Sequence, residues 1–328
     1  MKFNILFNLL IITIQLTISG CETSDDVASE YLDFSGPGPL TLADPHIMLY
    51  DSVYYAYGTS NANGIEVYYS KNLYDWTKHN RLALNKKDVF GEHSFWAPEV
   101  YYIPEKRKFY MCYTAEQKIC LAESISPLGP FTQSNQQPLL DFPAIDNTLF
   151  ICDGKYYMYF STADNPMEIY VVEIDSISLN PLIPTLTKCC TPEQKWETYL
   201  TRINEGPFVI RKSNNYYMFY SANGYESQNY AIGCAIADNP LGPWRKIEEN
   251  PILEFPKYGD KILLGVGHGS AFKDNEATWK FVFHAHHSDS NVEPRQTFIC
   301  DLIFFEKSKK IVPILGTNII QPFVTIRD

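Results

Sequence analysis

An aromatic doublet at the start of a short β-like run recurs five times along the chain, and this repeat constrains the fold more than any other feature. The copies begin at Tyr54, Phe109, Tyr156, Tyr216 and, more loosely, Phe281, spaced by roughly 45 to 65 residues. A turn-forming or charged residue precedes each doublet, and a second β-like run follows it. A repeat of this size that contains three or four short strands predicts one blade of a β-propeller.

Five copies predict an all-β, five-bladed β-propeller, which we place at residues 39–328. No amphipathic helical period separates the predicted strands, and an aromatic fraction of 15% with 23 Tyr suits pleated sheets. A β-sandwich of many short strands is the alternative, but it gives no reason for the repetition. How the ring of blades closes stays open, because neither end of the chain visibly supplies a strand to the opposite blade.

Residues 1–20 have the pattern of a bacterial lipoprotein signal peptide. Lys2 precedes a mainly apolar run that is shorter than the about 20 residues of a membrane span. The run ends in Ile18-Ser19-Gly20-Cys21, which resembles a lipobox, so we expect cleavage before Cys21 and lipidation of its thiol. An ordinary signal peptide with an incidental cysteine is the alternative. Residues 21–38 are then a flexible acidic tether, and the protein is an extracytoplasmic lipoprotein of the outer membrane, on its periplasmic or cell-surface side.

The charge and the metal-binding residue types exclude several other classes of function. A net charge of −11 argues against nucleic acid and against anionic membrane surfaces as partners. We therefore expect contact with a membrane only through the lipid on Cys21. Seven cysteines remain beside Cys21, without zinc-ligand spacing, so we expect buried small hydrophobes, with one stray disulfide left open. His284, His286 and His287 also lack that spacing and are predicted to be core or rim residues. A neutral, hydroxyl-rich ligand such as a sugar is compatible with this charge.

An ionisable residue begins the apolar run that precedes each doublet: Asp44, Glu99, Asp146, Glu205 and, in the fifth repeat, His268. Because the first strand of every propeller blade lines the central channel, equivalent positions converge on one axis. Carboxylates crowded in a partly desolvated channel have pKa values that are pushed apart. Glycoside hydrolysis needs such a pair of acid and base. Strand-leading acids often serve as turn groups, but four in one register favour a shared site.

Five motifs in these runs resemble those of family 43 glycoside hydrolases and occur in that family's order, from about Leu42 to about Phe305. The motifs are Ala43-Asp44-Pro45-His46, Trp96-Ala97-Pro98-Glu99, Ile145-Asp146-Asn147, Asn204-Glu205-Gly206-Pro207 and Gly267-His268-Gly269-Ser270. The resemblance implies a five-bladed propeller that hydrolyses glycosidic bonds with inversion. It makes Asp44 the general base, Glu205 the general acid, and Asp146 the carboxylate that tunes the pKa of the acid. Inversion requires the base and the acid to lie roughly 6.5 to 9.5 Å apart.

The resemblance also points to residues around the substrate and to a channel ion. Arg295 matches an arginine of the last blade that faces the substrate, with an exposed turn arginine as the alternative. Trp96 offers an apolar wall for a sugar face or is a core residue, and His46 and Glu99 complete the predicted substrate-binding set. His268 matches a histidine that holds Ca²⁺ or Na⁺ through water in some members, or it fills the channel without a metal. We expect no required cofactor.

These features together predict an inverting glycosidase that acts on plant cell-wall pentosans. We expect a monomer whose partners are oligosaccharides or polysaccharides such as arabinan and arabinoxylan. An α-L-arabinofuranosidase is favoured, and β-xylosidase, endo-arabinanase and exo-galactosidase stay open. A non-catalytic glycan-binding surface propeller is the alternative from a different class, and the complete set of acids argues against it. The segment from Thr187 to Tyr199, which carries Trp196, is the predicted wall of a substrate subsite.

Overall fold

The computed structural model describes residues 37–307 and 310–325. These residues belong to the second of two compact units of the chain, Tyr31–Asp328, and consist almost wholly of strands, turns and loops. The predicted signal peptide 1–20, Cys21 and the tether up to residue 36 lie outside the described residues. No helix in the described ranges is long and apolar enough to cross a membrane.

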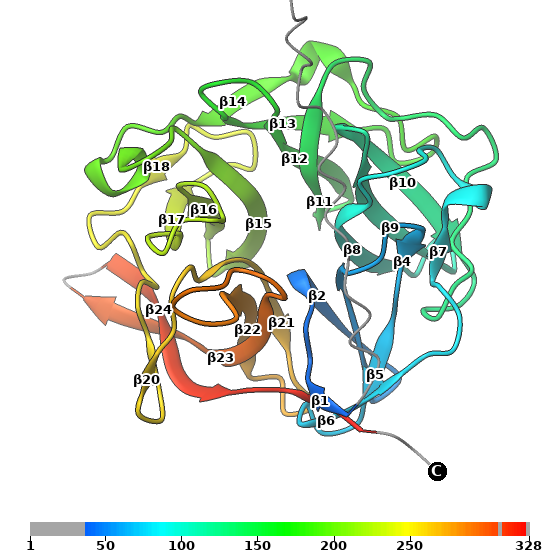
Figure 1. Cartoon of the computed structure of the whole chain (residues 1–328). Coiled ribbons are helices and arrows are strands. Elements are labelled where there is room, and N and C mark those ends of the chain that lie inside the picture. Colours follow the sequence, from blue (N-terminus) through cyan, green and yellow to red (C-terminus); the bar gives the residue numbers. More distant parts are fainter. Residues whose placement is uncertain (1–36, 308–309, 326–328) are drawn as a thin grey trace, which may run out of the picture. The chain divides into compact units, whose positions relative to one another are not determined.

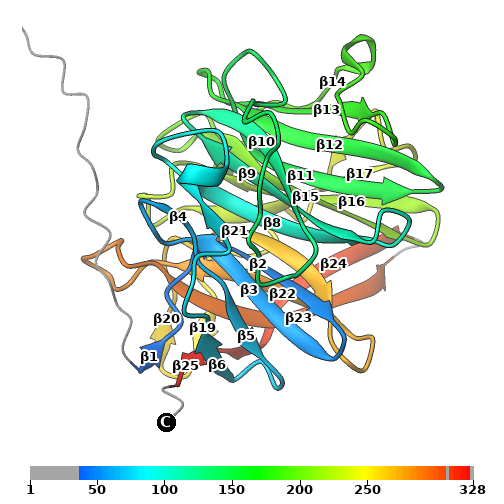
Figure 2. The ribbon, with the colours of Figure 1, turned by 90° about the vertical axis from the view of Figure 1, so that its right-hand side faces the viewer.

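Five small sheets surround a central axis in the described part of the chain, and they form a five-bladed β-propeller (Figure 1). The predicted fold is therefore confirmed and the β-sandwich alternative is wrong. Seen from the side, the strands of the blades run obliquely between the two faces of the propeller (Figure 2). In chain order the blades consist of β2 (Ala43–Tyr50), β3 (Val53–Thr59), β5 (Tyr68–Ser70) and β6 (Asp75–Lys78); β8 (Trp96–Ile103), β9 (Lys108–Ala115) and β10 (Lys118–Ser124); β11 (Ala144–Cys152), β12 (Lys155–Thr162), β13 (Ile169–Ile174) and β14 (Thr187–Cys190); β15 (Asn204–Lys212), β16 (Asn215–Ala222), β17 (Ala231–Ala237) and β18 (Arg245–Lys246); and β21 (Gly267–Lys273), β22 (Trp279–Ala285), β23 (Gln296–Lys307) and β24 (Lys310–Ile320).

Short elements occur in the connections within and between the blades. They are two small strand pairs, β4 (Gly64–Ile65) with β7 (Leu84–Asn85) and β19 (Lys257–Tyr258) with β20 (Lys261–Ile262), and three short 3-10 helices, η1 (Lys86–Asp88), η2 (Ile183–Thr185) and η3 (Lys195–Thr198).

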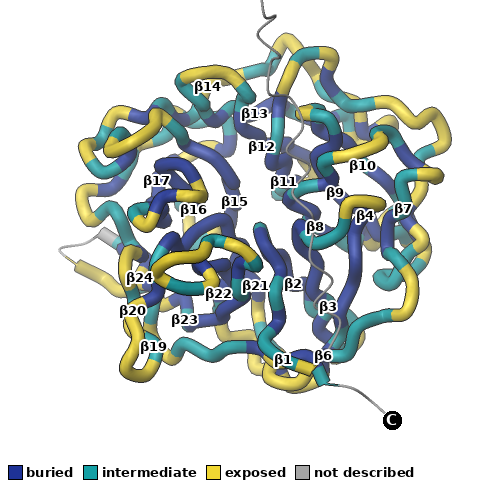
Figure 3. The backbone as a smooth tube through the Cα atoms, in the orientation of Figure 1, coloured by how far each residue is buried: buried dark blue, intermediate teal, exposed yellow. Residues whose placement is uncertain are grey.

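The hydrophobic core lies between adjacent blades rather than at one centre. Each core cluster among the described residues joins two neighbouring blades, and the cluster that contains Trp76 joins the fifth blade to the first. The doublets begin the second strands and contribute large buried rings; the innermost strands are buried, while the outer loops are exposed (Figure 3). All seven described cysteines are free thiols, and five of them are buried, as expected: Cys112, Cys120, Cys190, Cys234 and Cys300.

The C-terminal segment closes the ring, which settles the question that the sequence left open. After β24 the chain runs to the first blade, where β25 (Phe323–Val324) pairs in parallel with β6. The short strand β1 (Gly38–Pro39) pairs with β25 on the outside. Further on, the Leu40 N–H donates to the Pro322 carbonyl at 2.8 Å. Backbone hydrogen bonds of both chain ends therefore hold the junction of the first and fifth blades.

Every innermost strand carries a two-residue bulge near its start. The pairing with the second strand is interrupted at the same place in all five blades of the described chain. A bulge leaves extra residues unpaired and turns their side chains in a new direction. The first bulge residue has a positive φ in each case: Asp44 (49°), Ala97 (44°), Asp146 (59°), Gly206 (56°) and His268 (40°).

The bulges also connect each blade to its neighbour through the backbone N–H of the first bulge residue. At four junctions this N–H donates to a side chain at the end of the preceding blade's second strand: Ala97 to Thr59 Oγ1 (2.9 Å), Asp146 to Thr114 Oγ1 (2.9 Å), His268 to Ser221 Oγ (2.7 Å) and Asp44 to His284 Nδ1 (3.1 Å). At the junction of the third and fourth blades the Gly206 N–H donates instead to Asp146 Oδ2 at 3.3 Å. The equivalent hydroxyl, Ser161 Oγ, is buried without a hydrogen-bond partner among the described residues. The ring of hydrogen bonds thus changes where Asp146 and Glu205 meet.

Candidate active site

The polar residues predicted from the repeat lie at the start of the innermost strands, around the mouth of the central channel. Asp44, Asp146 and His268 occupy the equivalent bulge position in three blades. Left-handed backbone is unfavourable for residues other than glycine, so the surrounding ladder and the inter-blade hydrogen bonds hold these three residues in place. The bulge directs their side chains toward the axis.

Glu205 and Glu99 do not share that position, which corrects the sequence alignment of the blades. Glu205 pairs with Ser221 one residue before the bulge, and Gly206 takes the bulge position. In the second blade Ala97 takes it, and Glu99 follows two residues later, paired with Cys112. For Glu99, counting back from the doublet fails because the turn between β8 and β9 is longer than the turn between β2 and β3. Glu205 lies eleven residues before its doublet, one more than Asp44, and is therefore one residue out of register.

Asp44 is an ionised carboxylate held by cationic and hydroxyl groups. Its Oδ1 accepts a hydrogen bond from Arg295 Nη1 at 3.0 Å, and its Oδ2 accepts one from Thr59 Oγ1 at 2.7 Å. His268 Nδ1 lies 3.4 Å from the same Oδ1. Burial by itself would raise the pKa of Asp44, but the positive charge of Arg295, together with the hydrogen bond from Thr59, lowers that pKa well below its ordinary value.

Arg295 is buried and is itself fixed on several sides. Its Nε donates to Glu293 Oε1 at 3.0 Å, and its guanidinium carbon lies 4.5 Å from the centroid of the Tyr225 ring. The sequence offered an exposed turn arginine as the alternative, and the 8% exposure of Arg295 excludes that interpretation. The guanidinium therefore acts as a fixed positive charge beside Asp44.

Asp146 and Glu205 lie in a different electrostatic environment from Asp44. Burial, then the negative charges of Glu205 and Asp44, raise the pKa of Asp146 well above its usual range. Burial also raises the pKa of Glu205 to about 7, while a hydrogen bond from Tyr230 opposes that rise. The pair therefore retains a proton near neutral pH at which Asp44 is ionised. His268 Nδ1 is 4.0 Å from Asp146 Oδ2, so Asp44 and Asp146 flank one imidazole ring.

Tyr230 and His284 link the acid to the base, and the sequence analysis did not identify either as a site residue. The Tyr230 hydroxyl donates to Glu205 Oε1 at 2.6 Å, and its ring stacks on His284 with centroids 5.7 Å apart. Burial lowers the pKa of His284 well below its ordinary value, so the ring is neutral and its Nδ1 accepts the Asp44 N–H. Gly267 makes this stack possible, because a Cβ there would lie 2.0 Å from the Tyr230 ring.

A repeated sequence signal would have found His284. The second strands of the first four blades end in a hydroxyl residue that faces the next bulge: Thr59, Thr114, Ser161 and Ser221. His284 occupies that position in the fifth blade, opposite Gly267. A histidine that replaces a repeated hydroxyl beside the predicted base marks a site residue.

The remaining predicted substrate residues lie at two depths of the channel. Trp96 begins β8 and is partly buried, in the register position that Glu205 occupies in β15. His46 and Glu99 come after the bulges, one layer deeper. His46 Nε2 lies 3.1 Å from the Val100 carbonyl oxygen, and burial lowers the pKa of His46 to about 4. Their contacts with a substrate stay predictions.

Glu99 holds a proton at neutral pH. Burial raises its pKa to about 8, although hydrogen bonds with Thr148 and Tyr101 act in the opposite direction. The Tyr101 hydroxyl also lies 2.7 Å from Thr148 Oγ1. Glu99 therefore belongs to a hydrogen-bonded group of neighbouring blades in the channel.

No group of three or more His, Cys, Asp or Glu side chains suited to a metal ion occurs in the described ranges. His268 Nδ1 faces the carboxylates of Asp44 and Asp146. A cation held by His268 through water stays a prediction.

A buried ion pair supports the strand of Glu205 from behind. Lys246 Nζ lies 2.6 Å from Glu197 Oε1 and donates to Asn204 Oδ1 at 2.9 Å, directly before Glu205. Trp196, from the segment predicted as a subsite wall, packs on Tyr220 with ring centroids 6.0 Å apart. Trp196 is thus part of this support, whereas Tyr199 of the same segment is 67% exposed.

Residues 38–306 match the profile of glycosyl hydrolases family 43. The chain belongs to glycosyl hydrolase family 43. It is accordingly a glycosidase that hydrolyses O-glycosyl bonds. The match reaches all five blades and ends before β24, and the fold is the one that the family resemblance implied.

Several proteins are similar to this family 43 member. A crystal structure of an endo-1,4-β-xylanase from Bacteroides thetaiotaomicron is 37% identical, with a TM-score of 0.83, covering 88% of this chain and 99% of that one. A β-D-galactofuranosidase of Aspergillus niger is 24% identical over 83% of this chain and 82% of its own length. An extracellular exo-α-(1→5)-L-arabinofuranosidase of Streptomyces avermitilis is 25% identical over 63% of this chain, which spans 46% of that protein.

Proposed function

We propose that this enzyme hydrolyses glycosides in a single displacement with inversion, with Asp44 as the general base and Glu205 as the general acid. The opposite pKa shifts of these two carboxyl groups carry the proposal. The pKa of Asp44 is lowered well below its usual range, so Asp44 can accept a proton from water at neutral pH. The pKa of Glu205 is raised to about 7, so Glu205 has a proton to donate.

The proposed reaction forms one bond and breaks one bond. Asp44 removes a proton from a water molecule as the oxygen of that water attacks the anomeric carbon. Glu205 donates its proton to the glycosidic oxygen as the bond to the leaving group breaks, and the product sugar has the opposite anomeric configuration. In the proposal, Asp146 positions the acid and tunes its pKa, because its carboxylate accepts the N–H of Gly206, the residue that directly follows Glu205.

An α-L-arabinofuranoside is the substrate we favour. Similar proteins from two organisms are named as an arabinofuranosidase and a galactofuranosidase. The rings of α-L-arabinofuranose and β-D-galactofuranose share one configuration and differ in the exocyclic arm, so a pocket for one accommodates the ring of the other. In the proposal, Trp96 packs on the C–H face of the furanose ring, and Arg295 contacts the hydroxyl groups.

A β-1,4-xyloside is the second candidate. The observation that favours it is the 37% identity to the solved structure named as an endo-1,4-β-xylanase. The substrates expected from the sequence separate the two candidates. Arabinan oligosaccharides contain arabinofuranosyl linkages, whereas arabinoxylan oligosaccharides also contain β-1,4-xylosyl linkages. A propeller that binds glycans without hydrolysis would cleave none of them.

A panel of aryl glycosides and oligosaccharides tests the proposal. The panel contains an α-L-arabinofuranoside, a β-D-xyloside and a β-D-galactofuranoside, and proton NMR identifies the anomer formed first. We expect inversion, and on the oligosaccharides, whose poor leaving groups need the proton of the acid, a kcat for Asp44→Asn and Glu205→Gln lower by at least about 10²-fold, the lower range for general acid–base catalysis. Asp141→Asn, which changes an exposed aspartate, is the control and keeps the wild-type kcat. A product of retained configuration, or a wild-type kcat in either site variant, would overturn the role assignments.

We also propose that the enzyme works outside the cytoplasm as a lipoprotein of the outer membrane, anchored through Cys21. The lipobox-like sequence before Cys21 supports this, and a similar protein is named as extracellular. Cell fractionation tests it: the wild-type protein is expected in the membrane fraction, and Cys21→Ser in a soluble fraction. Equal membrane association of the two proteins would contradict lipidation.

A further inference from the structure

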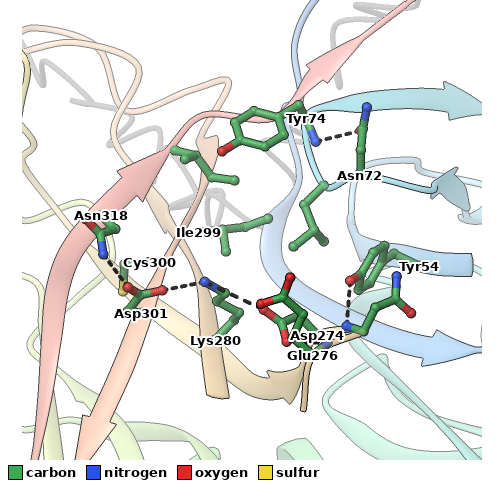
Figure 4. Close-up of a pocket in the computed structure, with 13 residues that line it drawn as sticks. Tyr54, Asn72, Tyr74, Asp274, Glu276, Lys280, Ile299, Cys300, Asp301 and Asn318 are labelled. Atoms are coloured by element: carbon green, nitrogen blue, oxygen red, sulfur yellow. Dashed lines mark hydrogen bonds and ion pairs between the residues drawn. The ribbon is translucent and has the colours of Figure 1, made fainter. Parts of the chain in front are cut away.

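A pocket of about 460 Å³ lies at the junction where the ring of blades closes, away from the carboxylates of the active site (Figure 4). Its walls come from the first blade and the fifth blade. The first blade contributes Tyr54 and the turn between β5 and β6, and the fifth contributes the turn between β21 and β22 together with β23 and β24. The volume is within the range of small-molecule sites.

The pocket is near the opposite end of the strands that carry the active-site residues. His268 is the second residue of β21, whereas Asp274 directly follows the last residue of that strand. Seven residues of β-strand span about 20 Å. Tyr54, likewise, follows the turn at the far end of β2 from Asp44. A ligand in this pocket therefore does not reach the catalytic carboxylates.

The pocket combines an apolar floor with a polar wall. Leu73 and Ile299 are buried and form part of the floor. On the wall, Lys280 Nζ lies 2.5 Å from Asp301 Oδ1 and 3.8 Å from Asp274 Oδ2, and Asn318 also bonds Asp301 (Figure 4). A surface of this kind binds both the C–H groups and the hydroxyl groups of a sugar.

Tyr74 is an exposed aromatic ring on a rigid backbone. It is 56% exposed, and its hydroxyl makes no hydrogen bond to the residues that the structure describes. Its backbone is fixed on both sides, because its N–H donates to Asn72 Oδ1 at 3.0 Å and its carbonyl accepts the Phe323 N–H at 2.7 Å. A ring held in this way offers contact area at low entropic cost.

The charge of the pocket selects against anionic ligands. The carboxylates of Asp274, Glu276 and Asp301 face one ammonium group, that of Lys280, among the described residues that line the pocket. The Lys280 ammonium is occupied by two of these carboxylates. Phosphates and uronic acids would be repelled, whereas neutral hydroxyl groups find acceptors and donors.

We propose that this pocket is a second glycan-binding site, which takes a neutral sugar residue of a polysaccharide and holds the enzyme on its substrate. Tyr74 packs on the sugar ring, and Lys280, Asp274 and Asp301 bond its hydroxyl groups. The site is non-catalytic. The proposal rests on the geometry of the pocket, and the choice of probes alone follows from the proposed function.

Isoleucine-methyl NMR with the Glu205→Gln protein tests the proposal, because that variant does not consume the probe. Ile299 and Ile320 line the pocket and report on it, whereas Ile145 precedes Asp146 and reports on the active site. The probes are unbranched arabinohexaose and xylohexaose. We expect saturable shifts of Ile299 and Ile320 with at least one probe.

The variant Tyr74→Ala is expected to weaken binding at the pocket at least tenfold and to leave the Ile145 response intact. Phe305→Ala is the matched control, since Phe305 is also 56% exposed but lies outside the pocket. In the active enzyme, which retains Glu205, Tyr74→Ala is expected to slow the hydrolysis of insoluble arabinoxylan. The kcat/KM of this variant on an aryl glycoside is expected to equal that of the wild type.

Several results would overturn the second site. They are the absence of shifts at Ile299 and Ile320 with both sugars, an unchanged response in Tyr74→Ala, an equal loss in Phe305→Ala, or shifts with spermidine instead of sugar. Failure of the proposed function is distinguishable from these results. A retained product configuration or a wild-type kcat in a site variant is measured by kinetics and leaves the response at Ile299 in place, and a sugar that the active site does not take gives no response at Ile145.

Discussion

Removal of the Tyr230 hydroxyl isolates the influence of one hydrogen bond on the proposed acid. That hydroxyl donates to Glu205 Oε1 at 2.6 Å inside a fully buried pair. The bond favours the ionised carboxylate and therefore holds the pKa of Glu205 below the value that burial alone would produce. In Tyr230→Phe this opposing effect is lost, so the pKa of Glu205 rises.

The size of the shift follows from the strength of the bond. Hydrogen bonds to charged groups contribute about 1.5–3 kcal/mol, and one pKa unit corresponds to about 1.4 kcal/mol. The pKa of Glu205, about 7 in the wild type, is thus expected to rise by about one to two units in Tyr230→Phe. Because the acid must be protonated to act, the alkaline decline of kcat/KM moves to higher pH by the same amount.

The measurement is the pH dependence of kcat/KM, which reports the ionisations of the free enzyme. The substrate is an oligosaccharide, because its poor leaving group needs the proton of the acid. Tyr159→Phe is the matched control: Tyr159 is equally buried, and its hydroxyl donates to the Pro240 carbonyl at 2.7 Å, away from the carboxylates. An alkaline decline that stays in place in Tyr230→Phe, moves to lower pH, or moves equally in Tyr159→Phe would refute the reasoning.

Three further predictions concern the base, the inter-blade hydrogen bonds and the channel. Arg295→Met removes the strongest lowering influence on the pKa of Asp44, so the acidic decline of kcat/KM should move to higher pH; an unmoved decline would contradict the assignment. Ser221→Ala leaves the buried His268 N–H without an acceptor and should lower the free energy of unfolding, measured in urea, by about 1–3 kcal/mol. Ser161→Ala removes a hydroxyl without a partner and should leave that free energy nearly unchanged; equal losses would argue against the altered junction. The pKa of Glu99 is raised in the folded state to about 8, so Glu99 ionises first in the unfolded chain, and the free energy of unfolding falls as pH rises from about 4.5 to 8. Glu99→Gln should reduce the difference in unfolding free energy between pH 5 and pH 8.5. An unchanged difference would mean that Glu99 is ionised in the folded protein.

The sequence predicted the fold because the information lies in short, repeated stretches. Each blade needs its own turns, aromatic strand and inner strand, so the pattern returns in every repeat and is legible without long-range contacts. The convergence of Asp44 and Asp146 on one channel followed from the same repeat. The resemblance added their roles, which the experiments above test.

The position of Glu99 relative to the bulge was not predictable from spacing, whereas Glu205 lies eleven residues before its doublet, one more than Asp44 and Asp146, which already places Gly206 at the bulge. A difference of one or two residues in a hairpin turn changes the count from the doublet without changing the pattern of apolar residues. Gly206 marks the bulge of the fourth blade, since a glycine adopts positive φ readily. Ala97 gives no such sign in the second blade.

The sequence by itself determined that five similar sheets surround one axis and that acids lie at the start of their inner strands. The tertiary structure alone decided which groups surround those acids. His284 and Arg295 reach Asp44 from the last blade, and Tyr230 reaches Glu205 from the loop directly before β17 of the fourth blade. These contacts depend on how the ring closes and on the direction of each side chain at a bulge. Neither the closure of the ring nor the direction of a side chain produces a periodic pattern in the sequence. The electrostatic difference between the base and the acid is therefore visible only in the folded chain.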